Sequence, residues 1–216
     1  MAQLEDFTAQ PVALIGFPQL AVARADHSHP RRSEIEYFIC ERYWLSFSAC
    51  LSNLPEQLIY IVDEADQLIA ACALTTAVKS SAQQGETLQQ LFSEMYLTEP
   101  AEQRLSAMYA TSIARAQVIE VGSMACLNHH YLAALFTAVL QVTSATSSDY
   151  LIFTATSPLR RHLKRMQLPS KVLTEAQQTA LPVSKRSSWG AYYDTKPQVV
   201  AGRISDGEQF LQALQQ

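Results

Sequence analysis

Residues 117–166 decide the fold class of this 216-residue chain; their sequence is QVIEVGSMACLNHHYLAALFTAVLQVTSATSSDYLIFTATSPLRRHLKRM. The stretch begins with a strand-like run that bends at Gly122 and continues into a helix whose apolar residues share one face. After a polar turn come the apolar strand Tyr150–Ala155 and a short helix capped by Ser157, with Pro158 at its first position. Strand, helix, strand and helix in this order predict a right-handed unit with two parallel strands.

The segment before this unit predicts short strands at Val12–Ile15 and Leu20–Ala23, followed by a helix. Ser33 and Glu36 have the spacing of a capping box, in which each side chain satisfies a free backbone amide at a helix start. Seven apolar residues then recur at helical period: Ile35, Phe38, Ile39, Tyr43, Phe47, Cys50 and Leu51.

Alternating apolar runs at Leu58–Val62 and Leu68–Thr76, separated by Asp63–Asp66, predict a hairpin. Residues 79–84 read as a loop, residues 88–97 fit either a helix or a strand, and residues 102–114 fit a helix. A last strand is predicted at Val199–Ile204. Together these elements predict an α/β protein with a central mixed β-sheet flanked by helices. We expect one domain over residues 1–216, with a core of about 11–204 and a C-terminal tail at 205–216.

The composition argues against several classes of function. The chain has 16 basic and 20 acidic residues, a net charge of −4, which argues against a nucleic-acid partner. The N-terminal residues Met1–Phe7 carry two acids and no positive charge, unlike a secretory signal. The apolar stretch Pro11–Ala23 is too short and too interrupted to span a bilayer. We therefore expect a cytoplasmic protein without a transmembrane segment, in which the four cysteines are buried thiols and no metal is bound.

The strand end at Glu120–Ala125 is the candidate site, because ligands in open α/β sheets bind at the carboxyl ends of strands. Gly122 marks either a packing bend or the close approach of a ligand. Glu120 and Glu94 are acids in apolar surroundings, where an unpaired charge is costly. Each fits either a general base with a pKa raised by burial or a partner of an arginine.

Two further features accompany this strand end. His129 and His130 stand at the start of the next helix, where one of them could contact an anionic ligand. The helix after Ser157 carries four cations that form either a solvated basic face or a phosphate-binding patch: Arg160, Arg161, Lys164 and Arg165. The sequence contains no recognisable nucleophile motif, which disfavours covalent hydrolase chemistry.

Four short blocks, in this order along the chain, resemble the thermostable hemolysin family. They are Leu-Phe-Ser-Glu-Met-Tyr-Leu (91–97), Val-Ile-Glu-Val-Gly-Ser-Met-Ala (118–125), Phe-Thr-Ala-Thr-Ser-Pro-Leu-Arg (153–160) and Trp-Gly-Ala-Tyr-Tyr (189–193), followed by Pro197 and Gly202. That family resembles the GCN5-related N-acyltransferases and, more closely, the acyl-homoserine-lactone synthases. The resemblance therefore implies an acyl-CoA N-acyltransferase-like fold.

The resemblance also implies roles for residues. The strand that contains Gly122, Ser123, Met124 and Ala125 would line the acyl and pantetheine channel, with backbone groups of its last two residues offered to the pantetheine arm. On the acceptor side, Glu94 and Glu120 would line the site and three aromatic residues would enclose it: Trp189, Tyr192 and Tyr193. One departure is that residues 127–134 contain no glycine, whereas such enzymes often have a glycine-rich loop there for the pyrophosphate of coenzyme A.

The resulting hypothesis is an N-acyltransferase that moves an acyl group from a thioester to a small-molecule amine. No tightly bound cofactor is expected, and the donor substrate is either acyl-CoA or an acyl carrier protein that docks on the basic helix. Two alternatives remain: a non-catalytic partner or binding subunit that keeps the fold, and a membrane-active hemolysin. The sequence leaves the oligomeric state open, whether monomer, homo-oligomer or hetero-oligomer.

Overall fold

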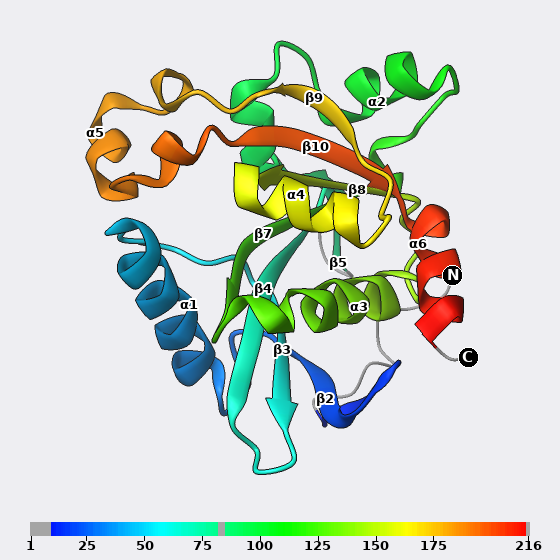
Figure 1. Ribbon diagram of the computed structural model, residues 1–216. Coiled ribbons are helices and arrows are strands. Elements are labelled where there is room, and N and C mark those ends of the chain that lie inside the picture. Colours follow the sequence, from blue (N-terminus) through cyan, green and yellow to red (C-terminus); the bar gives the residue numbers. More distant parts are fainter. Residues whose placement is uncertain (1–9, 82–84, 215–216) are drawn as a thin grey trace.

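A mixed sheet of eight strands forms the centre of the computed structural model, which describes residues 10–81 and 85–214 (Figure 1). The strand order is β1-β2-β3-β4-β7-β8-β10-β9, and only β7 and β8 are parallel neighbours. The predicted mixed sheet and the parallel unit are therefore confirmed. The strands are β1 (Val12–Leu14), β2 (Phe17–Ala25), β3 (Gln57–Asp63), β4 (Leu68–Thr76), β7 (Val118–Cys126), β8 (Tyr150–Ala155), β9 (Lys171–Glu175) and β10 (Gln198–Arg203).

Helices cover both faces of this sheet. Three helices pack on one face: α3 (Leu132–Thr143), α4 (Ser157–Arg165) and α6 (Ile204–Leu214). Their residues Leu135, Leu163 and Leu211 belong to one core cluster with side chains of β1, β2, β3, β4, β7, β8 and β10. On the other face lie α1 (Arg32–Phe47) and α2 (Ala101–Tyr109). Successive strand residues alternate between the two faces, as the two-residue period of a strand requires. Of these helices, α1, α3 and α4 supply residues that lie near the carboxyl ends of β7 and β8.

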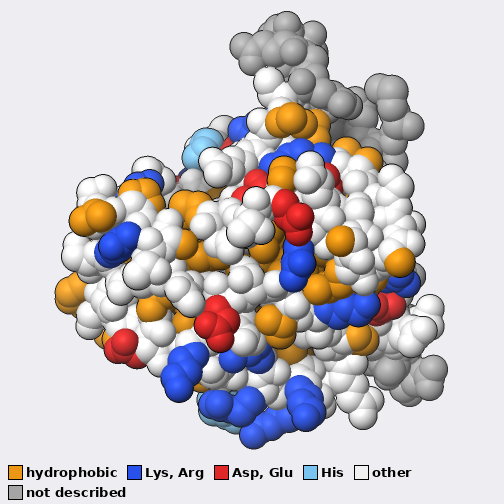
Figure 2. Space-filling model, turned by 90° about the horizontal axis from the view of Figure 1, so that it is seen from above, with side chains coloured by type: hydrophobic (Ala, Val, Ile, Leu, Met, Phe, Trp, Pro, Cys, Tyr) orange, Lys and Arg blue, Asp and Glu red, His pale blue; other side chains and the backbone are white. Residues whose placement is uncertain are grey.

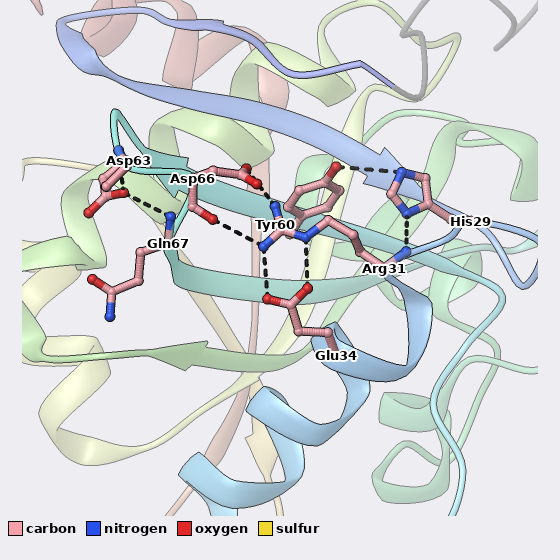
Figure 3. Close-up of polar contacts among 8 residues, drawn as sticks. His29, Arg31, Glu34, Tyr60, Asp63, Asp66 and Gln67 are labelled. Atoms are coloured by element: carbon pink, nitrogen blue, oxygen red, sulfur yellow. Dashed lines mark hydrogen bonds and ion pairs between the residues drawn. The ribbon is translucent and has the colours of Figure 1, made fainter.

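The predicted capping box of Ser33 and Glu36 is absent from the start of α1. The helix begins at Arg32, so Ser33 lies inside it, and no side chain caps its first amides. Instead Arg31 donates to Glu34 and to Asp66 of the β3–β4 turn, each at 2.7 Å (Figure 3). The buried Arg32 donates to three backbone carbonyls, those of Ala25, Pro55 and Glu56. Contacts with distant residues thus fix this helix start, which local spacing could not reveal.

Two other helix boundaries differ from the predicted ones. Thr156, not Ser157, caps α4 and accepts from the Leu159 amide, so Pro158 is the second residue of the helix rather than the predicted first. The helix α1 ends at Phe47 because Ser48 turns left-handed at a φ of 53°, so Cys50 and Leu51 lie beyond it. Because Cys50 is exposed and only Cys72 of the four free thiols is fully buried, the prediction of four buried cysteines is wrong.

Three segments differ from the sequence expectations in type. Residues 79–81 belong to a hairpin of β5 (Val78–Ser81) and β6 (Gly85–Leu88) rather than to a loop, and residues 82–84 lie outside the described residues, as do Met1–Phe7. Phe92–Tyr96 is a 3-10 helix, η2, and α2 ends at Tyr109. Residues 205–214 form most of α6 rather than a tail, because Phe210 and Leu211 pack into the core beside α3. Within the described ranges, no helix is long and apolar enough to cross a membrane.

Candidate functional site between β7 and β8

A pocket opens where β7 and β8 separate. The two strands pair from Val118–Tyr150 to Glu120–Ile152, and their later residues face a cavity of about 550 Å³. Its walls come from α1, the end of β7, the start of α3, the end of β8, α4 and Tyr192. The lining residues are Arg42, Tyr43, Leu45, Ser46, Phe47, Met124, Ala125, Cys126, Leu127, Asn128, His129, Leu132, Thr154, Thr156, Pro158, Leu159, Arg161, His162, Arg165 and Tyr192.

A bulge in β7 orients this wall of the pocket. Ala71 of β4 pairs with Ala125 and Ala73 pairs with Gly122, so two β7 residues lie opposite one residue of β4. Ser123, the first of these two, has a φ of 50°. The extra residue reverses the alternation of side chains, so that Met124 packs with the core under α3 and α4. The predicted bend exists, but its left-handed residue is Ser123 rather than Gly122.

Gly122 should accordingly tolerate a side chain. A Cβ atom built on it has no heavy atom of the described residues within 4 Å, its two chain neighbours aside, and its φ lies outside the left-handed region. We expect Gly122→Ala to leave the free energy of unfolding unchanged or to raise it by up to about 1 kcal/mol, because alanine restricts the unfolded chain more than glycine does. Urea denaturation tests this, and a loss above about 1 kcal/mol would mean that the bulge needs the glycine.

Glu120 is buried on the α1 and α2 side of β7, with 4% of its surface exposed. Its carboxylate accepts from the amide of Phe92 at 2.6 Å and from the amide and hydroxyl of Ser93 at 2.7 and 2.5 Å. Burial raises the pKa of Glu120 above its ordinary range, although these donors oppose the rise. A carboxyl group with a raised pKa exchanges protons nearer neutral pH than an exposed glutamate does.

Ser93 connects Glu120 to the pocket. Its hydroxyl lies 3.3 Å from the hydroxyl of Thr154, which lines the cavity on β8. Because the single proton of the Ser93 hydroxyl points to the Glu120 carboxylate, the Thr154 hydroxyl donates to Ser93 and keeps its lone pairs for the pocket. A hydrogen-bonded chain therefore joins a buried carboxylate to the cavity.

Glu94 has a different environment, since it pairs with an arginine. Its two oxygens lie 2.7 and 2.8 Å from the guanidinium of Arg115 and also accept from the amides of Leu91 and Ala101. Burial acts to raise the pKa of Glu94, but Arg115 and the two amides outweigh it and lower the pKa overall. Glu94 is absent from the pocket lining and matches the second of the two roles weighed for it, the partner of an arginine.

We expect Glu94→Gln to destabilise the fold by about 1 to 3 kcal/mol at pH 7, because Arg115 loses the bidentate partner of a nearly buried ion-pair network and keeps only Glu102 among the described residues. The lowered pKa means that the carboxylate stabilises the fold above its ordinary pKa and loses this effect as pH falls through the lowered value. Urea denaturation of both proteins should give curves that converge only below about pH 4.5. Equal stability at pH 7 would contradict the structural role.

An aromatic group lies beside Glu120 and the pocket. Trp189 packs on Phe92 at 5.4 Å between ring centroids and on Tyr192 at 5.1 Å, and the hydroxyls of Tyr96 and Tyr193 lie 2.6 Å apart. Burial is the main cause that raises the pKa of each of these three tyrosines, so their hydroxyls stay protonated near neutral pH. Of this group only Tyr192 lines the cavity.

The structure brings together four of the sequence-predicted site residues in the pocket lining: Met124, Ala125, His129 and Tyr192. His130 and Arg160 lie outside the lining, and the Arg160 guanidinium donates to the carbonyls of Ala155 and Lys196. Sequence reasoning missed the contributions of Ser93, Thr154, Arg42 and His162. Ser93 and Thr154 lie within the two blocks 91–97 and 153–160, which was the only available signal for them.

The chain has an N-acyltransferase-like fold, in which two parallel strands part over a pocket. The N-acyl amino acid synthase FeeM from uncultured soil microbes is 13% identical, covers 85% of this chain and 90% of its own, and has a TM-score of 0.54. The AHL synthase LasI is 7% identical, with coverages of 86% and 90% and a TM-score of 0.55. TofI in an apo form is 12% identical, with coverages of 89% and 98% and a TM-score of 0.55.

The chain itself belongs to the thermostable hemolysin family, which matches residues 25–208. The resemblance inferred from the four sequence blocks is therefore confirmed, as is the acyltransferase-like fold. A sequence comparison with curated proteins gives no match. Because the structural relatives are below 25% identical, they establish the fold alone.

Proposed function

We propose that this protein transfers an acyl group from a thioester to an amine, with the thioester of coenzyme A or of a carrier protein as donor. The observation that carries the proposal is the pocket between the separated ends of β7 and β8, to which the chain Glu120–Ser93–Thr154 leads. The acyl chain would lie along the apolar wall that includes Met124, Leu132 and Leu159. Backbone groups near the bulge would polarise the thioester carbonyl.

The proposed reaction begins when the amine nitrogen attacks the thioester carbon. A carbon–nitrogen bond forms, and the carbon–sulfur bond breaks as the thiolate leaves. The amine proton passes to Thr154, whose own proton moves to Ser93 while the Ser93 proton moves to Glu120. The proton then returns to the thiolate or to solvent, so that one turnover leaves the protein unchanged. Binding of both substrates in one pocket would supply much of the rate by positioning.

A thermal-shift titration tests the donor site first. The probes are coenzyme A, octanoyl and palmitoyl thioesters of coenzyme A and of pantetheine, and an acyl carrier protein. A donor at about 100 times its dissociation constant should stabilise the folded protein by roughly 2.7 kcal/mol. Thiol release from the bound donor is then measured across a panel of amines, amino acids included.

Stabilisation by a thioester together with amine-dependent thiol release would support the proposal. No stabilisation by any thioester would overturn it and favour a non-catalytic subunit that keeps the fold. Leakage from liposomes, measured on the same protein in several lipid compositions, tests the membrane-active alternative separately. The pocket supplies no observation that favours leakage.

A further inference from the structure

The mouth of the pocket carries cations without acidic partners. Arg161 and Arg165 of α4 line the cavity, and Lys164 lies exposed beside them. None of the three has an ion pair within the described part of the chain, whereas Arg31, Arg32 and Arg115 each pair with a glutamate. Figure 2 shows Lys and Arg side chains gathered along its lower edge, where α4 lies. In a chain with a net charge of −4, this basic surface is a local exception.

Two polar atoms in the pocket wall point to an anionic or polar ligand. Arg42 on α1 pairs with Glu41 through one terminal nitrogen, and its Nε atom is buried without a hydrogen-bond partner in the described residues. The Nε2 atom of His162 on α4 is likewise buried without a partner there. Both residues line the cavity, one from α1 and the other from α4. Buried polar atoms are normally hydrogen-bonded in the functional state, so a ligand between α1 and α4 would satisfy them.

Four amides around the start of α3, in contrast, already donate to the protein's own acceptors. The Asn128 side chain accepts from the His130 amide, and the Asn128 carbonyl accepts from the Tyr131 amide. The Leu127 amide donates to Ile69, and the Leu132 amide donates to His129. A pyrophosphate held by free amides at a helix start would have to displace these acceptors. Side chains of α1 and α4 are therefore better placed for phosphate recognition than these four amides.

We infer that the donor is an acyl group on the phosphopantetheine arm of a small acidic carrier protein, which docks on the basic surface of α4; this rests on the proposed acyl transfer. Such an arm carries one phosphate, which suits Arg42, Arg161 and Arg165 at the mouth. The acidic carrier covers the exposed cations of α4, while the rest of this acidic chain repels it, so that charge fixes the docking orientation. The thioester end reaches the wall at Met124 and Ala125.

The test compares a triple reversal on α4 (Arg161→Glu, Lys164→Glu and Arg165→Glu) with the single reversal Lys185→Glu. Lys185 is an exposed cation on α5 (Val183–Arg186) and does not line the pocket. The binding of octanoyl carrier protein, octanoyl-CoA and octanoyl-pantetheine is measured for each protein at low and high salt. Octanoyl-pantetheine lacks the phosphate and the carrier, so it reports on the acyl site alone.

The wild-type protein should bind octanoyl carrier protein more than about 10-fold more tightly than octanoyl-CoA, and this preference should shrink at 1 M salt, where charges are screened within about 3 Å. The triple reversal should weaken carrier binding by more than about 10-fold, and Lys185→Glu should leave it unchanged. Equal binding of carrier and coenzyme A donors, or equal effects of the two reversals, would overturn the docking inference. Failure of octanoyl-pantetheine to bind or react would instead count against the proposed function.

Discussion

Replacement of Glu120 by glutamine is expected to lower kcat for amine acylation by about 10²- to 10⁴-fold, the usual contribution of a positioned general base. The amide of glutamine fits the same space but cannot take up the proton that Ser93 delivers. The wild-type rate should fall as pH is lowered through the raised pKa of Glu120, and this acid limb should be missing in Glu120→Gln. Single-turnover thiol release across a pH series measures both effects.

A merely structural role for Glu120 would give a different pattern. Thr154→Val keeps the shape of the β8 side chain and removes the hydroxyl that faces the pocket, so it should lose a similar factor in kcat. The double variant Glu120→Gln/Thr154→Val should lose little more than either single variant, because groups that act as one chain are not additive. Thr154→Ser keeps a hydroxyl and should recover most of the rate. Full activity in Thr154→Val would remove this chain from the mechanism.

Gly190→Ala is expected to destabilise the fold by at least about 3 kcal/mol. Gly190 has a φ of 46° and a ψ of −128°, and a Cβ atom there would lie 2.1 Å from the carbonyl oxygen of Phe47. That contact cannot be relieved cheaply, because the Phe47 carbonyl accepts from the Ala191 amide and the Cys50 amide donates to Ser188. The substitution would push the segment 188–191 away from the end of α1.

Urea and thermal denaturation measure this effect, which should lower Tm by roughly 6 to 12 °C for a chain of this size. Gly122→Ala is the matched control, since that Cβ atom meets open space. Displacement of the segment should also weaken donor binding, because Tyr192 forms part of the pocket wall. A Gly190→Ala protein with wild-type stability would show that the end of α1 adapts to the added methyl group.

Much of the fold follows from local patterns. The strands β2, β3, β4, β7, β8 and β10 and the helices α1 and α3 lie where apolar periodicity predicts them. Helix ends are harder to predict from local patterns. The start of α1, for example, depends on the hydrogen bond from Arg31 to Asp66, which lies 35 positions away in the chain. The hairpin β5–β6 and helix α6 have weak local patterns, which predict a loop at residues 79–84 and a tail at residues 205–216. Their position depends on neighbours that a linear pattern does not contain.

The sequence by itself determined the sheet, its one parallel pair, the family and the strand end where the pocket lies. It also marked Glu120 as a buried acid, because a carboxylate between Ile119 and Val121 must find partners. Only the tertiary structure decided what those partners are. It joined Glu120 to Ser93 and Thr154 and gave Glu94 to Arg115. Each of these contacts joins residues from different elements of the fold. The physical reason is that hydrogen bonds and ion pairs depend on distances between atoms. The folded chain sets these distances across separations of 21 to 61 residues, which sequence spacing does not encode.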